Sequence, residues 1–164
     1  MDTVDRATRS RMMSAVRSRG TRSEIDLRRR LSALGFRYRV NVRDLPGRPD
    51  IVFPKYKSVV FIHGCFWHSH ECPFGAAPQT RRVWWKRKLE GNRVRDQDVL
   101  AILHGVGWRT AVVWECSFRG AGAKRDTTLD SIARRIAVFV RSRRRHLEIA
   151  GKTAKGAGNP RRGD

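Results

Sequence analysis

Long apolar segments are missing from this chain. No run of about 20 apolar residues occurs, which excludes a transmembrane helix. Residues 1–20 lack the apolar centre of a secretory signal, so we expect a cytoplasmic protein with no membrane partner. Cysteine is also scarce. Three cysteines in 164 residues do not make a disulfide framework, and metal binding or thiol chemistry is their expected use.

Acidic residues are few: 15 Asp and Glu stand against 36 Lys and Arg, and the formal net charge is +21. Arginine dominates lysine, and its planar guanidinium suits phosphate geometry and stacking. A chain this basic concentrates on polyanions, of which nucleic acid is the commonest. A basic tail on an unrelated domain is the alternative, but cationic runs such as Arg28–Arg30 and Lys86–Lys88 also lie between the apolar segments.

The length fits one domain with a substantial core. We expect a basic arm at 1–20, a folded domain at 21–142 and a basic, Gly-rich, disordered tail at 143–164. The domain should begin with a capping box, in which Thr21 and Glu24 satisfy free amides of the first helical turn. The helix that follows should bury Leu27, Leu31 and Leu34 and end at Gly35.

Apolar runs bounded by Pro and Gly predict strands, and 3.6-residue periodicity predicts two more helices. The strands are expected at 36–42, 51–53, 58–63 and 108–114, and the helices at 82–103 and 127–140. The first of these helices should break near Gly91 and Asn92. This order indicates an α/β domain with a mixed central sheet flanked by helices.

The segment from Phe61 to Cys72 concentrates thiols and imidazoles. Cys65, His70 and Cys72 are ligands of the type that zinc prefers, and Cys116 follows a predicted strand that could bring it to them. Four such ligands with no vacancy indicate a structural zinc site and not a catalytic one. Free buried cysteines with incidental histidines are the alternative. The two remaining histidines, at 104 and 146, are expected to be ordinary surface residues.

Asp50 lies at the start of a predicted strand, after a Pro-Gly turn. Nucleases that hydrolyse phosphodiesters commonly use such a carboxylate for Mg²⁺. Many of them carry Glu-x-Lys on the next strand, but this chain has Phe61-Ile62-His63 there, so His63 and His68 are the candidate proton acceptors. A turn-capping role for Asp50 is the alternative. Two further acids, Glu24 and Asp96, could reach the site, although helix capping and a surface salt bridge explain each of them singly.

Two strings, Gly47-Arg48-Pro49-Asp50 and His63-Gly64-Cys65-Phe66-Trp67-His68, together resemble the very-short-patch-repair (Vsr) DNA mismatch endonucleases. The resemblance runs from about Arg6 to Phe118. It implies a restriction-endonuclease-like core that nicks one strand of double-stranded DNA 5′ to the thymine of a T:G mismatch. Such mismatches arise when 5-methylcytosine deaminates.

The resemblance also implies roles for single residues. Asp50 would be the principal Mg²⁺ ligand, assisted by the main-chain carbonyl of Ile62, where the family usually has Thr. His68 would be the general base, and His63 would act near the leaving group or a water on the metal. Asp96 would orient or charge-balance His63, and Glu24 would lie on the water network of the metal. The zinc site carries over onto Cys65, His70, Cys72 and Cys116.

Phe66, Trp67 and Trp85 match the aromatic side chains that the family inserts between bases, and Met13 would form a wedge from the minor groove. Rings stacked beside a base pair replace lost base stacking, and a mismatch is unstacked more cheaply than its neighbours. Core packing is the alternative for each Trp, and it is the role expected of the other three, Trp84, Trp108 and Trp114.

Two other functions stay open: a catalytically silent zinc module that binds distorted duplex, and a nuclease on the same scaffold that cuts other mismatches or matched DNA. The expected partners are mismatched duplex DNA and mismatch-repair proteins. We expect a monomer associated with the nucleoid.

Overall fold

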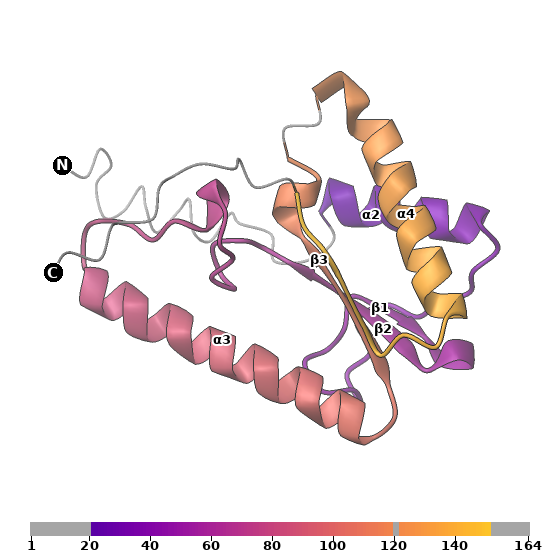
Figure 1. Cartoon of the computed structure of the whole chain (residues 1–164), viewed down its shortest axis with the longest axis horizontal. Helices are drawn as coiled ribbons and strands as arrows, with labels where there is room; N and C mark the ends of the chain where they lie inside the picture. The colour runs from indigo at the N-terminus through magenta and orange to yellow at the C-terminus, as the bar shows by residue number, and fades with distance from the viewer. Residues whose placement is uncertain (1–20, 120–121, 152–164) are drawn as a thin grey trace, which may run out of the picture.

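The fold is built on one mixed sheet with the strand order β1-β2-β3-β4. The computed structural model describes residues 21–119 and 122–151 (Figure 1). β1 (Ile51–Phe53) pairs antiparallel with β2 (Ser58–His63), and β3 (Arg109–Trp114) and β4 (His146–Ile149) continue the sheet parallel to β2. Short 3₁₀ turns are η1 (Pro54–Tyr56), η2 (Pro73–Gly75), η3 (Glu115–Ser117) and η4 (Gly122–Lys124).

Helices cover both faces of the sheet, as Figure 1 shows. α2 (Arg22–Ala33) and α4 (Arg125–Arg141) pack on one face, and α3 (Arg82–Gly105) packs on the other. Successive side chains of a strand point to opposite faces, so Val60 contributes to the first core cluster and Val59 to the second. The predicted α/β architecture is therefore confirmed. None of the described helices is long and apolar enough to cross a membrane.

The Thr21 half of the predicted capping box is confirmed, since the Thr21 hydroxyl accepts a hydrogen bond from the Glu24 amide at 3.3 Å. Leu27 and Leu31 are fully buried. The prediction for Leu34 is wrong: it is the C-cap residue, one position beyond the last residue of the helix, and 38 % of it is exposed.

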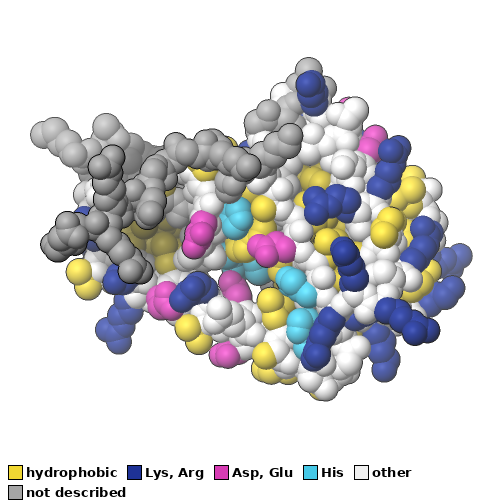
Figure 2. Space-filling model, viewed as in Figure 1, with side chains coloured by type: hydrophobic (Ala, Val, Ile, Leu, Met, Phe, Trp, Pro, Cys, Tyr) yellow, Lys and Arg dark blue, Asp and Glu magenta, His cyan; other side chains and the backbone are white. Residues whose placement is uncertain are grey.

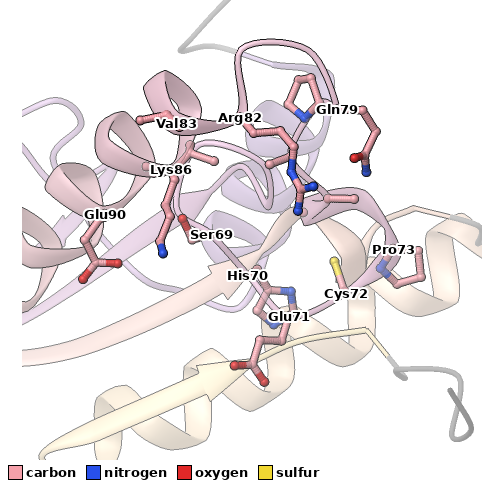
Figure 3. Close-up of a pocket in the computed structure, with 15 residues that line it drawn as sticks. Ser69, His70, Glu71, Cys72, Pro73, Gln79, Arg82, Val83, Lys86 and Glu90 are labelled. Carbon is pink, nitrogen blue, oxygen red and sulfur yellow. The ribbon is translucent and has the colours of Figure 1, made fainter. Parts of the chain in front are cut away.

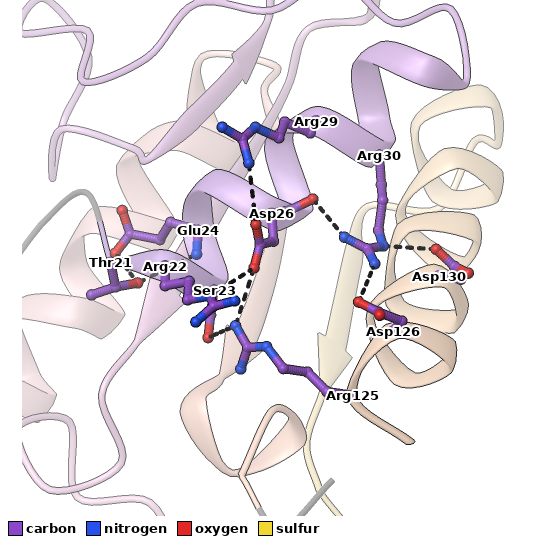
Figure 4. Close-up of polar contacts among 10 residues, drawn as sticks. All are labelled: Thr21, Arg22, Ser23, Glu24, Asp26, Arg29, Arg30, Arg125, Asp126 and Asp130. Atoms are coloured by element: carbon purple, nitrogen blue, oxygen red, sulfur yellow. Dashed lines mark hydrogen bonds and ion pairs between the residues drawn. The ribbon is translucent and has the colours of Figure 1, made fainter. Parts of the chain in front are cut away.

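Ion pairs join α2 to α4 (Figure 4). Arg30 contacts Asp126 and Asp130 on α4, both at 2.7 Å, and Arg125 reaches back to Asp26 at 3.3 Å. These pairs surround an apolar contact between the helices in which Leu31, Leu129 and Ile136 are all buried. The contact is thus apolar at its centre and charged at its rim.

Two predicted features of the middle of the chain are wrong. The segment 36–42 forms no strand: only Arg39 bridges Val52, and the left-handed Asn41 (φ +50°) turns the backbone out of the extended conformation. α3 does not break at Gly91 and runs unbroken for 24 residues. A glycine inside a helix costs about 1 kcal/mol, which the tertiary contacts of a long helix can offset.

The chain after α4 is also different from its prediction. His146–Ile149 forms β4, although the sequence predicts a disordered tail from residue 143. Four residues with two apolar side chains are too short for a periodic signal, and the strand is held by pairing with β3. His146 is exposed, as expected, but Thr110 Oγ1 lies 2.8 Å from both His146 Nδ1 and His104 Nε2. The basic arm at 1–20, Met13 included, and the tail from 152 onward lie outside the described residues.

Candidate active site and metal site

Asp50 enters the site through the pairing of β1 with β2. Its amide donates to the carbonyl of Val60 at 3.1 Å, and its carboxylate Oδ2 accepts from the amide of Ile62 at 2.7 Å. Asp50 is thus held through both its backbone and its carboxylate, and it keeps one position relative to β2. Asp50 and Ile62 line a cavity of about 320 Å³ together with His63, His68 and Asp96. Five residues expected at the catalytic site are thus brought together.

Asp96 on α3 holds His68. The distance between His68 Nδ1 and Asp96 Oδ2 is 2.6 Å, and both side chains are about one-quarter exposed. A carboxylate only accepts hydrogen bonds, so this contact places a proton on Nδ1 and leaves Nε2 able to accept one. The resemblance implies that Asp96 orients or charge-balances His63; its hydrogen bond goes to His68 instead, while its negative charge still acts on His63 and favours a higher pKa of that ring.

His63 is the buried member of the imidazole pair, with 9 % of it exposed. Burial lowers the pKa of His63 to about 3, and electrostatic repulsion from His68 acts in the same direction. The negative charge of Asp96 opposes this shift only in part. The two rings are stacked, with centroids 3.8 Å apart and planes within 3° of parallel. Ligand atoms of His63, His68 and Asp96 lie within 4.8 Å of one another, but imidazole binds metals in the plane of its ring, so two parallel stacked rings face a common ion poorly. The arrangement suits proton transfer better than metal binding.

Four ligand side chains gather where β2 and β3 both end. The ligand atoms of Cys65, His70, Cys72 and Cys116 all lie within 4.8 Å of one another. His70 Nδ1 is 3.6 Å from Cys116 Sγ, and a tetrahedral zinc site with ordinary Zn–S and Zn–N bonds requires about 3.6 Å. The parallel pairing of β2 with β3 brings Cys116 to the loop, as its place after the strand predicts.

Backbone amides point at two of the sulfurs. The amide of Cys116 donates to Cys65 Sγ at 3.3 Å, and the amide of Gly151 donates to Cys116 Sγ at 3.2 Å. Such donors stabilise thiolates. Burial raises the pKa of the Cys65 thiol to about 12, so this thiol is protonated at neutral pH until a metal displaces the proton. The donor set therefore fits a soft divalent ion such as zinc.

Two glycines pack against the backbone of the Cys65–Cys72 loop, which we call the metal loop, and of Cys116. The sequence analysis assigned a role to neither. A Cβ on Gly75 would lie 1.9 Å from the carbonyl oxygen of His70, and one on Gly151 would lie 2.4 Å from that of Cys116. Both contacts are with backbone, so neither can be relieved by a rotamer change. Gly151 lies in a Gly-rich stretch that gives no signal of its own.

Trp114 links the cluster of three cysteines and His70 to the two stacked imidazoles of His63 and His68. Its ring stacks on His70 at 4.2 Å and meets His63 edge-on at 5.3 Å. It also packs against the second core cluster, as does Trp108, so the core prediction holds in part for both. The core prediction for Trp84 is wrong, since 47 % of this side chain is exposed at the start of α3.

Phe66, Trp67 and Trp85 form one cluster of rings. Phe66 lies 5.0 Å from Trp67 and 5.1 Å from Trp85, centroid to centroid, and all three side chains are partly exposed. Asn92 fixes the loop below them, since its side-chain amide donates to the carbonyl of Trp67 at 3.0 Å. The three rings are therefore partly open to a ligand, and they are held in place by the loop after β2 and by α3.

A second cavity, of about 930 Å³, lies between the metal loop and the first turns of α3. Figure 3 shows Arg82, Lys86 and Glu90 of α3 on one side of it, and His70 and Glu71 of the loop on the other. Glu24 lines neither cavity. It is buried at the start of α2, where its carboxylate accepts hydrogen bonds from the Thr21 hydroxyl and from Arg28, both at 3.2 Å.

Comparison with known proteins assigns the chain to a family. The family model for the DNA mismatch endonuclease Vsr matches residues 1–73. A type II nicking enzyme of Xanthomonas oryzae pv. oryzae is 47 % identical over 122 residues, which are 74 % of this chain and 90 % of that protein. The DNA mismatch endonuclease Vsr of Escherichia coli K12 is 42 % identical over 78 % of this chain and 82 % of its own length. A Neisseria meningitidis type II nicking enzyme is 39 % identical over 76 % and 89 %, respectively. The chain belongs to the Vsr family of DNA mismatch endonucleases.

Proposed function

We propose that this enzyme nicks one strand of duplex DNA 5′ to the thymine of a T:G mismatch, with Mg²⁺ at the catalytic site and Zn²⁺ at the thiol site. The observation that carries the proposal is the cavity shared by Asp50, His68 and Asp96 beside a cluster of aromatic rings. We infer a restriction-endonuclease-like core, and a monomer that acts in the cytoplasm, with mismatch-repair proteins as further partners.

The donor atoms distinguish the two metals. Asp50 and the main-chain carbonyl of Ile62 are hard oxygen donors, which Mg²⁺ prefers, whereas three thiols and an imidazole suit Zn²⁺. Mg²⁺ held there would polarise the phosphate and lower the pKa of the attacking water. The zinc would fasten the loop that carries His68 to the end of β3, where Cys116 lies.

His68 Nε2 is the proton acceptor in this proposal. Asp96 holds the tautomer that leaves Nε2 unprotonated, and its negative charge stabilises the imidazolium that forms when His68 takes a proton from water. His63 stays neutral at pH 7 because of its low pKa, so it does not repel that imidazolium. We assign His63 to the side of the leaving group, as a neutral hydrogen-bonding ring.

The ring cluster provides mismatch selectivity. Inserting Phe66, Trp67 and Trp85 beside a base pair replaces base stacking by ring stacking, worth about 1–3 kcal/mol per base. Unstacking costs a few kcal/mol and is cheapest at a mismatch. The net balance therefore favours insertion at a wobble pair over insertion at its neighbours, before any base edge is contacted.

A nicking assay tests the proposal. Purified enzyme with Mg²⁺ should nick a T:G duplex at one phosphate and leave the matched duplex of the same sequence uncut. Asp50→Ala and His68→Ala should each abolish the nick and leave binding unchanged, whereas Asp98→Ala, an exposed acid on α3, should cut as the unmutated enzyme does.

Two outcomes would replace the proposal. Tight binding of T:G duplex with no cleavage, Mg²⁺ being present, would make the chain a silent binding module. Equal cleavage of matched and mismatched duplexes would make it an ordinary nuclease on the same scaffold.

A further inference from the structure

Five exposed cations gather at the end of the sheet opposite the catalytic cavity. They are Lys55, Lys57, Arg143, Arg144 and Arg145, and we call them the basic edge. Figure 2 shows Lys and Arg side chains crowded over the end of the molecule where η1 and the C-terminal end of α4 lie in Figure 1. None of the five forms an ion pair within residues 21–119 and 122–151.

Arg109 brings the two halves of the basic edge together. Its guanidinium donates to the carbonyls of Tyr56 and Ser142, and its amide donates to the carbonyl of Lys57 at 2.8 Å. The next amide, of Thr110, donates to the carbonyl of Arg145 at 3.1 Å. The turn before β2 and the turn before β4 therefore lie on either side of the start of β3. The backbone therefore holds Lys57 and Arg145 on the two sides of one strand, β3.

The basic edge and the catalytic cavity lie at opposite ends of the same strands. β2 and β3 both start at the basic edge and both end at the catalytic and metal sites. Six residues of strand, at about 3.3 Å each, separate the two ends by roughly 20 Å. A straight duplex that lies across the ends of the strands at the ring cluster does not reach the basic edge, and bending it around the sheet would cost several kcal/mol.

We propose that the basic edge binds the phosphate backbone of a second DNA segment while the first is held at the nicking site. Unpaired Lys and Arg on short turns fit phosphates, which need charge and no defined side-chain geometry. A protein partner fits less well, because protein interfaces have apolar cores, whereas the basic edge is defined by five exposed cations. The inference rests on the proposed function only for the identity of the first segment.

A capture experiment tests the second segment. Enzyme is bound, without Mg²⁺, to an immobilised T:G duplex, and a labelled matched duplex is then offered at low salt. The unmutated enzyme should retain the labelled duplex. The variant Arg143→Gln/Arg144→Gln/Arg145→Gln should retain roughly tenfold less or worse, because each lost phosphate contact removes about 0.9 from the slope of log affinity against log salt.

Matched variants separate this effect from net charge and from misfolding. Arg29→Gln/Lys124→Gln/Arg134→Gln also removes three exposed cations, all outside the basic edge, and should capture as the unmutated enzyme does. Changing the three arginines of the edge to lysine should restore capture. Equal capture by the two glutamine variants would overturn the proposal. So would an edge variant that loses binding of a polyglutamate peptide and keeps the labelled duplex.

Nicking of the T:G duplex with Mg²⁺ is measured on the same preparations. The edge variant should nick as well as the unmutated enzyme, since its changed side chains lie far from the cavity. Failure of all preparations to nick would count against the proposed function. Loss of capture in the edge variant alone, with nicking intact, supports the second binding surface.

Discussion

At the scale of single residues, the acid–base chemistry depends on which imidazole Asp96 contacts. The family resemblance places Asp96, His63 and His68 in one group and assigns Asp96 to orient or charge-balance His63. The hydrogen bond goes to His68, because α3 presents Asp96 to the loop after β2 and His63 is covered by its neighbour. The choice depends on the orientation of two rings only 3.8 Å apart, which residue spacing does not encode.

Asp96→Asn should slow nicking roughly a hundredfold or more, because the amide neither fixes the Nδ1 tautomer nor stabilises the imidazolium. Affinity for the T:G duplex should stay within about twofold of the unmutated value, since the side chain lies inside the cavity. Single-turnover nicking and equilibrium binding measure the two quantities. Asp98→Asn, on the same helix, is the control. A large loss of affinity with an unchanged nicking rate would contradict the assignment.

His63 should make stability depend on pH. Its pKa is about 3 in the folded protein and near 6.5 in the unfolded chain, so below pH 6.5 the unfolded chain binds the extra proton. The free energy of unfolding therefore carries no penalty from His63 above pH 6.5, and it falls progressively as the pH drops from 6.5 towards 3. At pH 5.5 the loss should be about 1.4 kcal/mol relative to pH 7.5.

Urea unfolding at the two pH values measures this loss. His63→Gln cannot titrate, so the pH-dependent fall in its free energy of unfolding should be smaller by that amount. Identical falls in the two proteins would show that His63 is not held neutral.

The four residues of the thiol–imidazole cluster were easier to predict from the sequence than the orientation of the two stacked histidine rings. Cys65, His70 and Cys72 lie close in the sequence, and Cys116 follows a strand that must pair in the same sheet, so spacing and topology suffice to predict the cluster. The role of Trp114 was not predictable, because apolar strand residues all favour burial. Its contact with His70 requires the loop to fold back over β3.

At the scale of elements, Arg109 joins β3 to the end of α4. Its guanidinium donates to carbonyls of Tyr56, Phe139, Val140 and Ser142, and thus caps the helix and holds the turn before β2. Arg109→Met should lower the free energy of unfolding by about 2–4 kcal/mol, because these carbonyls lose a charged donor. Arg134→Met, on the exposed face of α4, should change it by less than about 0.5 kcal/mol.

Urea denaturation followed by circular dichroism measures both values, and Arg109→Lys should recover only part of the loss because an ammonium reaches fewer carbonyls. If Arg109→Met were as stable as the unmutated enzyme, water would be replacing the guanidinium at these carbonyls with no loss of free energy of unfolding.

The element predictions succeeded where a segment is long or fully buried. β1 and β2 were predicted to the residue, and α4 within two residues at each end. β4 was missed because its pairing with β3 stabilises it, and no local pattern does. The false strand at 36–42 has strand-forming residues, but only Arg39 finds a partner on the three-residue β1.

At the scale of the whole molecule, the metal site should determine both stability and activity. Its four ligands come from the loop after β2 and from η3, so they join segments about 50 residues apart. Removal of the metal at the thiol site by a chelator should lower the midpoint of thermal unfolding, and nicking should stay abolished after Mg²⁺ alone is restored, because the loop that carries His68 loses its attachment. Metal analysis should find one zinc per chain.

Gly151→Ala provides a milder test of the same site. Its Cβ would press on the carbonyl of Cys116, so the variant should lose zinc to a chelator faster than the unmutated enzyme does. Gly105→Ala, whose Cβ would meet nothing within 4 Å, is the matched control. Equal rates of zinc loss in all three proteins would contradict a role for Gly151.

Helix α3 carries Trp85 in its first turn and Asp96 eleven residues later (96 − 85 = 11). About 16 Å of continuous helix therefore joins them, at 1.5 Å per residue. Residues on a loop could slide relative to one another, but residues on one helix keep both their separation and their angle. With the roles proposed above, the rigid helix fixes the distance between the inserted ring and the cavity where the phosphate would be cut. With both residues on one helix, we expect the nick to fall at one fixed offset from the site of ring insertion.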